Sequence, residues 1–305
     1  MEPKKIIVVG SANMDLIMRV ARLPKPGESL AGKQFMTAHG GKGANQAVAA
    51  ARLGASVTFV GVVGDDSFGA LQREGFIHEG ISLDYLKTTT KAPTGTALIL
   101  LTDSGQNAIM VAPGANYELL PADIAALRAT IAQADVVITQ LEIPLETMDA
   151  TLRLAQEVQC FSILDVGQAR TVAPETLARA SIVSPNETEA EALTGIAVTS
   201  IDAARSAARK LRDMGVAHVV MKLGAHGCLY YGMEELHVPA FDVAAVDTTA
   251  AGDAFTAALG VAWQQMSLDE ALRFANAAGA LAATAEGAQP SMPYLDAVNQ
   301  FLANA

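Results

Sequence analysis

The stretch "ADVVITQLEIPLETMDATLRLAQEVQCFSILDVG", residues 134–167, contains two short apolar runs separated by an amphipathic segment. Continuous apolar runs of this length are typical of strands buried on both faces, and the segment between them is typical of a helix. A strand–helix–strand unit of this kind joins parallel strands. The same alternation recurs along the chain, so we expect a three-layer α/β/α fold around a mostly parallel sheet.

Two segments interrupt this alternation, residues 12–38 and about 94–112. The second contains "TGTALILLTDSGQNAIMVAPG", in which "DSG" is typical of a hairpin turn between two strands. We expect these segments to form a small, mainly antiparallel sheet inserted into a single domain of residues 1–305. Such an insert would serve as a lid or as a pairing surface.

Composition and charge exclude several classes of partner. The chain is 51% hydrophobic and has a formal net charge of −11 without a basic run, so we expect no nucleic-acid partner. No apolar run approaches the roughly 18 residues that span a bilayer. The N-terminus has no signal-peptide pattern, so we expect a cytoplasmic protein with no membrane partner. Cys160 and Cys228 lie outside any metal-ligand spacing, and we expect two buried free thiols.

Polar residues and glycines follow several of the expected strands. They are Asn13 and Asp15 after the first strand, Glu142, Asp165 and Asn186 after three later strands, and Lys222 and Gly224 after a fourth. In open α/β sheets, ligands bind beyond the carboxyl ends of the strands. The sequence therefore predicts that these residues converge on one edge of the sheet.

The stretch "DTTAAGDAF", residues 247–255, places a glycine and an acid at the expected start of a helix. Gly252 lets the backbone approach a ligand closely because it has no Cβ. The N–H groups of Ala250, Ala251, Gly252 and Asp253 would point outward and bind an anion. The Asp253 carboxylate would then accept the proton of an alcohol during phosphoryl transfer. The alternative is an ordinary first-turn acid that the helix dipole stabilises by about 0.3–1 kcal/mol.

A second glycine-rich helix start lies in "AHGGKGANQAVAA", residues 38–50. Gly40 and Gly41 would expose backbone N–H groups, and Asn45 lies in the first turns of the helix. The pattern is not a Walker A loop, because GxxxxGK[ST] is absent. The alternative is a plain strand-to-helix turn, which needs only one glycine. We interpret Lys42 as a solvated charge and assign it no role.

Two acidic helix starts have both a structural and a metal-binding interpretation. In "SPNETEAEALTG", Asn186 and Glu189 have the spacing of a capping box, whereas Glu189 would alternatively hold water around Mg²⁺. One side chain does not easily do both. In "GDDSFG", residues 64–69, we expect Asp66 or Ser67 to cap the next helix rather than to bind a metal ion.

Several motifs, in this order along the whole chain, resemble those of the ribokinase-like carbohydrate kinases. They are "GSANMD" (10–15), "GGKGANQA" (40–47), "QLEIPLE" (140–146), "PNETEAE" (185–191), "DTTAAGD" (247–253) and "EGAQPSMP" (286–293). The resemblance implies ATP-dependent transfer of the γ-phosphoryl group to the 5-hydroxyl of D-ribose. Asp253 would be the base, and Gly252 with Ala250 and Ala251 would form the anion hole.

The resemblance also implies the ligands of each substrate. The sugar would be held by Asn13, Asp15, Gly40, Gly41, Asn45, Glu142 and Asp253. The nucleotide would be held by Asn186, Lys222, Gly224, Gly227, Gly252 and Asn276. Family members are similar in using Mg²⁺, for which Glu189 matches the supporting acid, and K⁺. The K⁺ positions are Asp247, Thr249, Ala282, Ala285, Gly287 and Ser291. The small sheet would be both the lid and the interface of a homodimer.

Two departures from the family pattern concern the substrate. Members commonly have Asn-Pro where this chain has "LDVGQAR" (164–170), and they often have Thr at the position of Lys222. If Arg170 reaches the sugar, an acidic substrate would fit. The alternatives are therefore a kinase of the same fold for 2-deoxyribose, a nucleoside or a sugar acid. From another class, a sugar or nucleotide sensor without catalysis stays open.

Overall fold

The main sheet of the protein has nine strands in the order β13-β12-β11-β10-β9-β8-β1-β4-β5. The computed structural model describes residues 3–104, 106–167 and 171–305. The strands are β1 (Lys5–Val9), β4 (Ser56–Gly64), β5 (Ser82–Thr89), β8 (Val136–Gln140), β9 (Phe161–Asp165), β10 (Ile182–Ser184), β11 (His218–Lys222), β12 (Cys228–Tyr231) and β13 (Glu235–Val238). The pairs from β5 to β11 are parallel, and the pairs β11–β12 and β12–β13 are antiparallel. The predicted mostly parallel sheet is confirmed.

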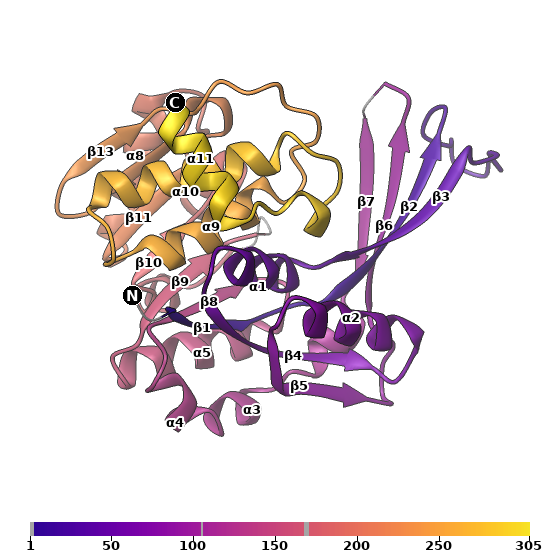
Figure 1. Cartoon of the computed structure of the whole chain (residues 1–305), viewed down its shortest axis with the longest axis horizontal. Helices are drawn as coiled ribbons and strands as arrows, with labels where there is room; N and C mark the ends of the chain where they lie inside the picture. The colour runs from indigo at the N-terminus through magenta and orange to yellow at the C-terminus, as the bar shows by residue number, and fades with distance from the viewer. Residues whose placement is uncertain (1–2, 105, 168–170) are drawn as a thin grey trace.

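Helices cover both faces of this sheet (Figure 1). One face is covered by α1 (Lys42–Arg52), α2 (Ser67–His78), α9 (Ala251–Ala262), α10 (Leu268–Ala282) and α11 (Leu295–Asn304). The other is covered by α3 (Pro121–Ala125), α4 (Arg128–Ile131), α5 (Leu145–Glu157), α6 (Pro174–Leu177), α7 (Glu187–Thr194) and α8 (Ile201–Asp213). Three 3₁₀ turns connect elements, η1 (Gly114–Glu118), η2 (Gly224–His226) and η3 (Gln289–Ser291).

Strand β1 shows why its sequence is apolar at every position. Ile6 and Val8 are buried in the core beneath α1, α9 and α10, whereas Ile7 and Val9 are buried in the core beneath α5 and α8. Because successive side chains of a strand point to opposite faces, a strand between two helical layers needs apolar residues throughout. The three-layer α/β/α prediction is confirmed.

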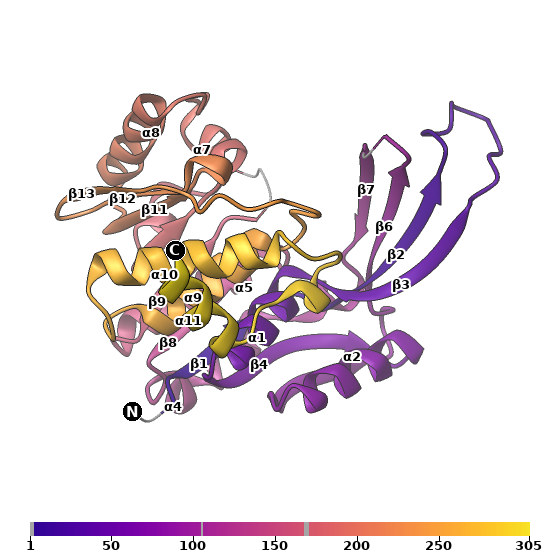
Figure 2. The same ribbon diagram turned by 45° about the horizontal axis from the view of Figure 1, so that its top comes forward.

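A second sheet of four strands stands away from the main body (Figures 1 and 2). Its order is β3-β2-β6-β7, with β2 (Asn13–Val20), β3 (Gln34–Gly40), β6 (Gly95–Thr102) and β7 (Asn107–Ala112). Each hairpin is antiparallel, but β2 and β6 pair in parallel. Two of the three strand pairs are antiparallel, which confirms the "mainly antiparallel" prediction, and the central pair is parallel because both hairpins start at the main sheet and extend outward. The role of this sheet as a lid stays a prediction.

Both cysteines are buried free thiols, as predicted. Burial raises the pKa of Cys160 to about 11 and that of Cys228 to about 12. Asp66 caps α2 by accepting a hydrogen bond from the Gly69 N–H, which confirms the structural interpretation of residues 64–69. In the described ranges, no helix is both long and apolar enough to cross a bilayer. The cytoplasmic location stays a prediction.

Candidate active site

The candidate site lies at the carboxyl edge of the main sheet, where α1 and α9 also begin. Gln140, Asp165 and Lys222 are the last residues of β8, β9 and β11. The backbone N–H of Lys222 donates to the carbonyl of Pro185 at 2.8 Å, which places the start of α7 beside them. These strands therefore bring polar residues together at one edge of the sheet, as predicted.

Asp253 is buried in the first turn of α9, with 3% of its surface exposed. Its Oδ2 accepts a hydrogen bond from Asn45 Nδ2 at 2.9 Å, and its Oδ1 accepts one from Gln46 Nε2 at 3.1 Å. Burial raises the pKa of Asp253; Lys42 opposes this shift, and Asp165 adds to it. Two side chains of α1 therefore hold this buried carboxylate, so it is not an ordinary first-turn acid stabilised only by the helix dipole.

The start of α9 has a strained backbone. Ala250 has a φ of 59°, in the left-handed region that non-glycine residues seldom adopt. The N–H of Ala251 donates to the Thr248 carbonyl at 3.3 Å and that of Asp253 to the Ala250 carbonyl at 3.0 Å. The prediction of four outward N–H groups is therefore wrong for these two, because the turn itself uses them. Among the described residues, the N–H groups of Ala250 and Gly252 have no partner.

Lys42, to which the sequence assigned no role, lies between two buried carboxylates. Its Nζ is 3.6 Å from Asp253 Oδ1 and 3.8 Å from Asp165 Oδ2. Burial lowers the pKa of Lys42, but the carboxylates, Asp165 and Asp253 foremost, raise it above its ordinary value, so the side chain is a cation. The interpretation of Lys42 as a solvated charge is wrong. The sequence feature that could have indicated this position is that Lys42 directly follows two glycines at the start of a helix.

Gln46 is a second residue that the sequence did not single out. Its Nε2 donates to Asp165 Oδ2 at 2.7 Å and to Asp253 Oδ1 at 3.1 Å. Its Oε1 accepts a hydrogen bond from Gln140 Nε2 at 2.6 Å. This bond fixes the amide orientation in which the N–H₂ group faces Asp165 and Asp253. The spacing of four residues from Lys42 puts both on one face of α1 and would have indicated this role.

Asp165 and Lys222, the two departures from the family pattern, contact each other. Lys222 Nζ donates to Asp165 Oδ1 at 2.7 Å and lies 3.5 Å from Thr256 Oγ1. Burial raises the pKa of Asp165, but Lys222 and Lys42 hold it below its ordinary value. Arg170 lies outside the described residues, so its suggested contact with the sugar stays a prediction.

The glycines before α1 are required by packing. A Cβ on Gly40 would lie 2.3 Å from the carboxylate oxygens of Asp15. Gly41 has a φ of 91°, and a Cβ there would lie 2.8 Å from the backbone nitrogen of Asn13. Gly41 therefore excludes a side chain through its backbone, whereas a side chain at Gly40 would displace the Asp15 carboxylate, and the alternative of a plain turn with one necessary glycine stays open.

The predicted sugar ligands Asn13 and Glu142 are held by neighbours. Asn13 Oδ1 accepts a hydrogen bond from Asn116 Nδ2 at 2.7 Å. Glu142 Oε2 accepts one from Ser11 Oγ at 2.5 Å and one from the Lys42 N–H at 3.1 Å. These contacts fix the side chains before any ligand arrives.

Asp15 and Asn45 have oxygens without partners. Burial, followed by the nearby charges of Glu142 and Asp253, raises the pKa of Asp15 to about 7. Its carboxylate accepts no hydrogen bond from the residues that the structure describes. The buried Oδ1 of Asn45 likewise has no partner there. Both are acceptors that a polyol would satisfy.

On the predicted nucleotide side, Asn186 and Glu189 form the capping box of α7. The box uses only Oε2 of Glu189, so Oε1 stays available, and the two interpretations of this residue are compatible. Asn276 Nδ2 donates to the carbonyls of Val238 and Pro239, both at 3.2 Å.

Both predicted nucleotide-binding glycines after β11 have a left-handed φ, 49° at Gly224 and 84° at Gly227. A Cβ on Gly227 would lie 2.1 Å from the Val238 carbonyl oxygen. Gly227 and Asn276 therefore fix the same segment after β13. Whether these residues bind a nucleotide stays a prediction.

The predicted K⁺ positions lie in two segments, the loop before α9 and the stretch from the end of α10 to η3. Asp247 accepts hydrogen bonds from the N–H groups of Thr249 and Gly287, both at 2.9 Å. Burial raises the pKa of Asp247, but a hydrogen bond from the Thr249 hydroxyl, together with these two N–H bonds, holds it below its ordinary value, so the group is a carboxylate. The Ala282 carbonyl accepts the Ala285 N–H at 3.3 Å, and Ser291 Oγ donates to the Ala288 carbonyl at 2.8 Å. The available donors are oxygens, which suit a hard cation.

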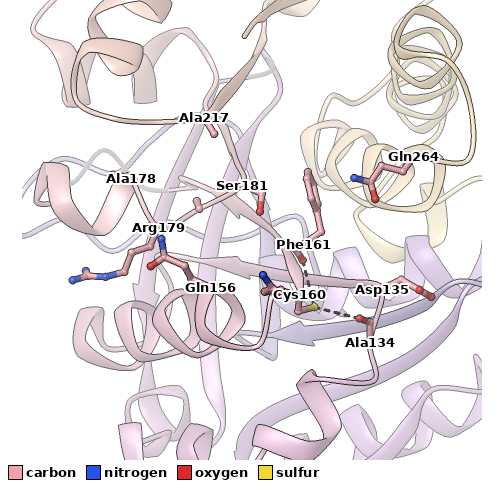
Figure 3. A pocket seen from close by; sticks show the side chains of 12 residues that line it. Ala134, Asp135, Gln156, Cys160, Phe161, Ala178, Arg179, Ser181, Ala217 and Gln264 are labelled. Carbon is pink, nitrogen blue, oxygen red and sulfur yellow. Dashed lines mark hydrogen bonds between the residues drawn. The ribbon is translucent and has the colours of Figure 1, made fainter. Parts of the chain in front are cut away.

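A cavity of about 530 Å³ lies at the opposite edge of the sheet (Figure 3). Asp135, Cys160, Ser181 and Ala217, which line it, each precede a strand directly. The cavity is therefore at the amino ends of β8 to β11. It contains none of the predicted site residues, so we do not assign the reaction to it.

The chain is similar in sequence and in fold to known carbohydrate kinases. Residues 3–295 match the model of the pfkB family of carbohydrate kinases. The chain is 40% identical to ribokinase of Haemophilus influenzae over 99% of each chain, and 35% identical to deoxyribokinase of Salmonella typhimurium over 97% of this chain and 98% of that one. Its fold matches that of Arabidopsis thaliana ribokinase complexed with ribose and ATP, with a TM-score of 0.91, 37% identity and 99% coverage of both chains.

The raised pKa of Asp15 predicts how stability changes with pH. The folded protein keeps a proton on this group up to about pH 7, whereas the unfolded chain releases it near the ordinary value of 3.8. The free energy of unfolding should therefore fall as the pH rises between these values. We expect Asp15→Asn to be stabilising, and more so at pH 8 than at pH 5.5 by about 2 kcal/mol, measured by urea denaturation.

Asp242→Asn, at an exposed aspartate, is the matched control and should change little at either pH. An equal effect of Asp15→Asn at both pH values would contradict the assignment.

Proposed function

Because this chain belongs to the pfkB family of carbohydrate kinases, we propose that it transfers the γ-phosphoryl group of ATP to the 5-hydroxyl of D-ribose. The products are ribose 5-phosphate and ADP. The observation that carries the proposal is the buried carboxylate of Asp253 at the start of α9, held by Asn45 and Gln46 and faced by Lys42. The similarity to full-length ribokinases supports ribose as the acceptor.

Asp253 acts as the general base. As the 5-oxygen of the sugar forms its bond to the γ-phosphorus, the hydroxyl proton passes to the Asp253 carboxylate, and the bond from the γ-phosphorus to the ADP oxygen breaks. An aspartate with its pKa raised by burial is a stronger base than an exposed one. Lys42, 3.6 Å from Asp253, and the free N–H of Gly252 would stabilise the negative charge of the transferred group.

The sugar hydroxyls bind to acceptors that this edge leaves open. Asp15 and the Oδ1 of Asn45 have no partner among the described residues, and Asn13 and Glu142 are fixed beside them. Gly40 and Gly41 contribute by admitting these side chains close to the backbone. An analogue that lacks a hydroxyl leaves one of these buried groups unpaired, which is the physical basis of selectivity.

Two ions complete the proposal. Glu189, with Oε1 outside its capping box, would hold the water shell of Mg²⁺, which shields phosphate charge when bound. Asp247, Thr249 and Ser291, with the carbonyls of Ala282 and Ala285 and the loop at Gly287, would hold K⁺ beside the start of α9. Asn186, Lys222, Gly224, Gly227 and Asn276 would contact the nucleotide.

Phosphorylation of 2-deoxyribose is a second candidate, because one relative is a deoxyribokinase at 35% identity. A nucleoside or a sugar acid also stays among the alternatives. 2-Deoxyribose lacks one hydroxyl of ribose, a nucleoside carries an additional nucleobase, and a sugar acid carries a negative charge. A comparison of these acceptors with ribose in one assay therefore distinguishes them.

The test of the proposed function is ADP release by the full chain over a panel of D-ribose, 2-deoxyribose, a nucleoside and a sugar acid. We expect D-ribose to have the highest kcat/KM. Asp253→Asn should fold normally and lower turnover by about 10²–10⁴-fold, roughly 3–5 kcal/mol of barrier, because it removes the base. Unchanged turnover in this variant would remove Asp253 from the mechanism, and a higher kcat/KM for another acceptor would replace ribose.

Removal of K⁺ tests the cation loops. At constant ionic strength, replacing K⁺ by a large organic cation should lower kcat, because the loop at Asp247 and Gly287 supports the start of α9. The measurement is ADP release during titration with K⁺. Equal rates in both salts would defeat the K⁺ assignment and leave the base in place.

The small sheet is also the proposed homodimer interface. Phe35 on β3 and Ile109 and Met110 on β7, the two edge strands of this sheet, are each more than half exposed, which is unusual for large apolar side chains. Sedimentation should show a dimer, and Ile109→Asp should produce monomers. Met233→Asp, on the β12–β13 turn where Met233 is 93% exposed, is the matched control and should stay dimeric. A monomeric native protein would contradict the interface.

A further inference from the structure

We propose that Asp165 is a positioning residue that holds the ammonium group of Lys222 against the phosphoryl group being transferred, so that this chain uses Lys222 as a second cation beside Lys42. The inference rests on the proposed function and deepens it. It concerns two residues that each depart from the family pattern and that form one ion pair, with Nζ and Oδ1 2.7 Å apart.

Lys222 lies beside the open side of Gly252. The three heavy atoms nearest to a Cβ built on Gly252 would all belong to Lys222, with its Nζ at 3.9 Å. The N–H of Gly252 has no partner among the described residues. An anion bound at this N–H would therefore also reach the ammonium group.

The ammonium group of Lys222 has a hydrogen-bond donor left for that anion. An ammonium group carries three N–H donors. Asp165 takes one at 2.7 Å, and Thr256 Oγ1 lies at 3.5 Å to take a second. The third is free to donate to a phosphate oxygen, and a charge-assisted bond of this kind is stronger than a neutral one.

Asp165 itself is not available to the sugar. It is fully buried, and both carboxylate oxygens are occupied, Oδ1 by Lys222 and Oδ2 by Gln46 at 2.7 Å. A free acid would bind a sugar hydroxyl, but this one has no open oxygen facing a ligand. The departure at Asp165 therefore acts on the phosphate side of the site, not on sugar recognition.

The two residues depend on each other through charge. Without Asp165, the ammonium groups of Lys222 and Lys42 would lose the carboxylate that pairs with both of them. Without Lys222, the buried Asp165 carboxylate would keep a single cation, Lys42, at 3.8 Å. It would also still share the Gln46 amide with Asp253. Removing one member of a buried pair costs more than removing both, because the remaining charge stays desolvated.

The test compares Asp165→Asn, Lys222→Thr and the double variant in the full chain. We expect kcat to fall by about 10-fold in Asp165→Asn and about 100-fold in Lys222→Thr, with KM for ribose within about twofold of the native value. The double variant should have a higher kcat than Lys222→Thr, since it no longer buries an unpaired acid. Multiplicative effects of the two single changes, or a rise in KM for ribose as the main effect, would overturn the proposal.

Calorimetry supplies a readout independent of turnover. Lys222→Thr should weaken binding of a non-hydrolysable ATP analogue by about 10-fold and leave ADP binding within about twofold, because Lys222 faces the group that ADP lacks. Equal losses for the two nucleotides would contradict this placement. Lys222→Arg should partly restore binding of the analogue, since it keeps the charge.

A control variant separates this effect from lost stability. Asp149 lies on α5, away from the site, and Asp149→Asn breaks its partly buried ion pair with Arg179, which follows α6. It should lower the unfolding free energy without changing kcat. If Asp165→Asn behaves in the same way, the pair is only structural and the inference fails. If the native chain releases no ADP with any sugar, the proposed function fails instead.

Discussion

The side-chain amide of Gln46 lies between two buried carboxylates, and the geometry of the site depends on it. Its N–H₂ group donates to Asp165 and to Asp253, while its oxygen is held by Gln140. Two acids this close would repel each other without a shared donor, and burial would make that repulsion stronger. Because one amide has two N–H bonds, a single side chain satisfies both acids and fixes their separation.

Close approach of backbones makes this arrangement possible. Gly43, in the first turn of α1, would place a Cβ 2.7 Å from the backbone nitrogen of Ser11, so α1 lies directly on the segment after β1. This contact brings Lys42 and Gln46 to the carboxyl edge of the sheet, opposite α9. The glycine-rich motif therefore acts mainly by positioning the polar side chains of α1, and only in part by exposing N–H groups.

Sequence patterns predicted those features that depend on period and order, such as the buried strands, the helical layers and the edge where Asp165, Asn186 and Lys222 gather. They also placed Asp253 in the first turn of a helix, where the structure has it. They did not predict the contact between Asp165 and Lys222, because 57 positions separate them and only the order of β9, β10 and β11 brings them together. Lys42 was misjudged because the direction of a side chain at a helix start depends on the turn before it, here on the backbone of Gly41.

The parallel pairing of β2 with β6 has a mechanical consequence. Eight consecutive residue pairs, from Asn13 with Gly95 to Val20 with Thr102, join the two hairpins into one plate. A tilt of either hairpin therefore carries the other with it. Asn13 and Asp15, which we propose as sugar ligands, belong to β2 and would move with this plate, whereas Asp253 on α9 belongs to the main body. Rotation about this junction thus changes the gap between the two halves of the site in a single movement.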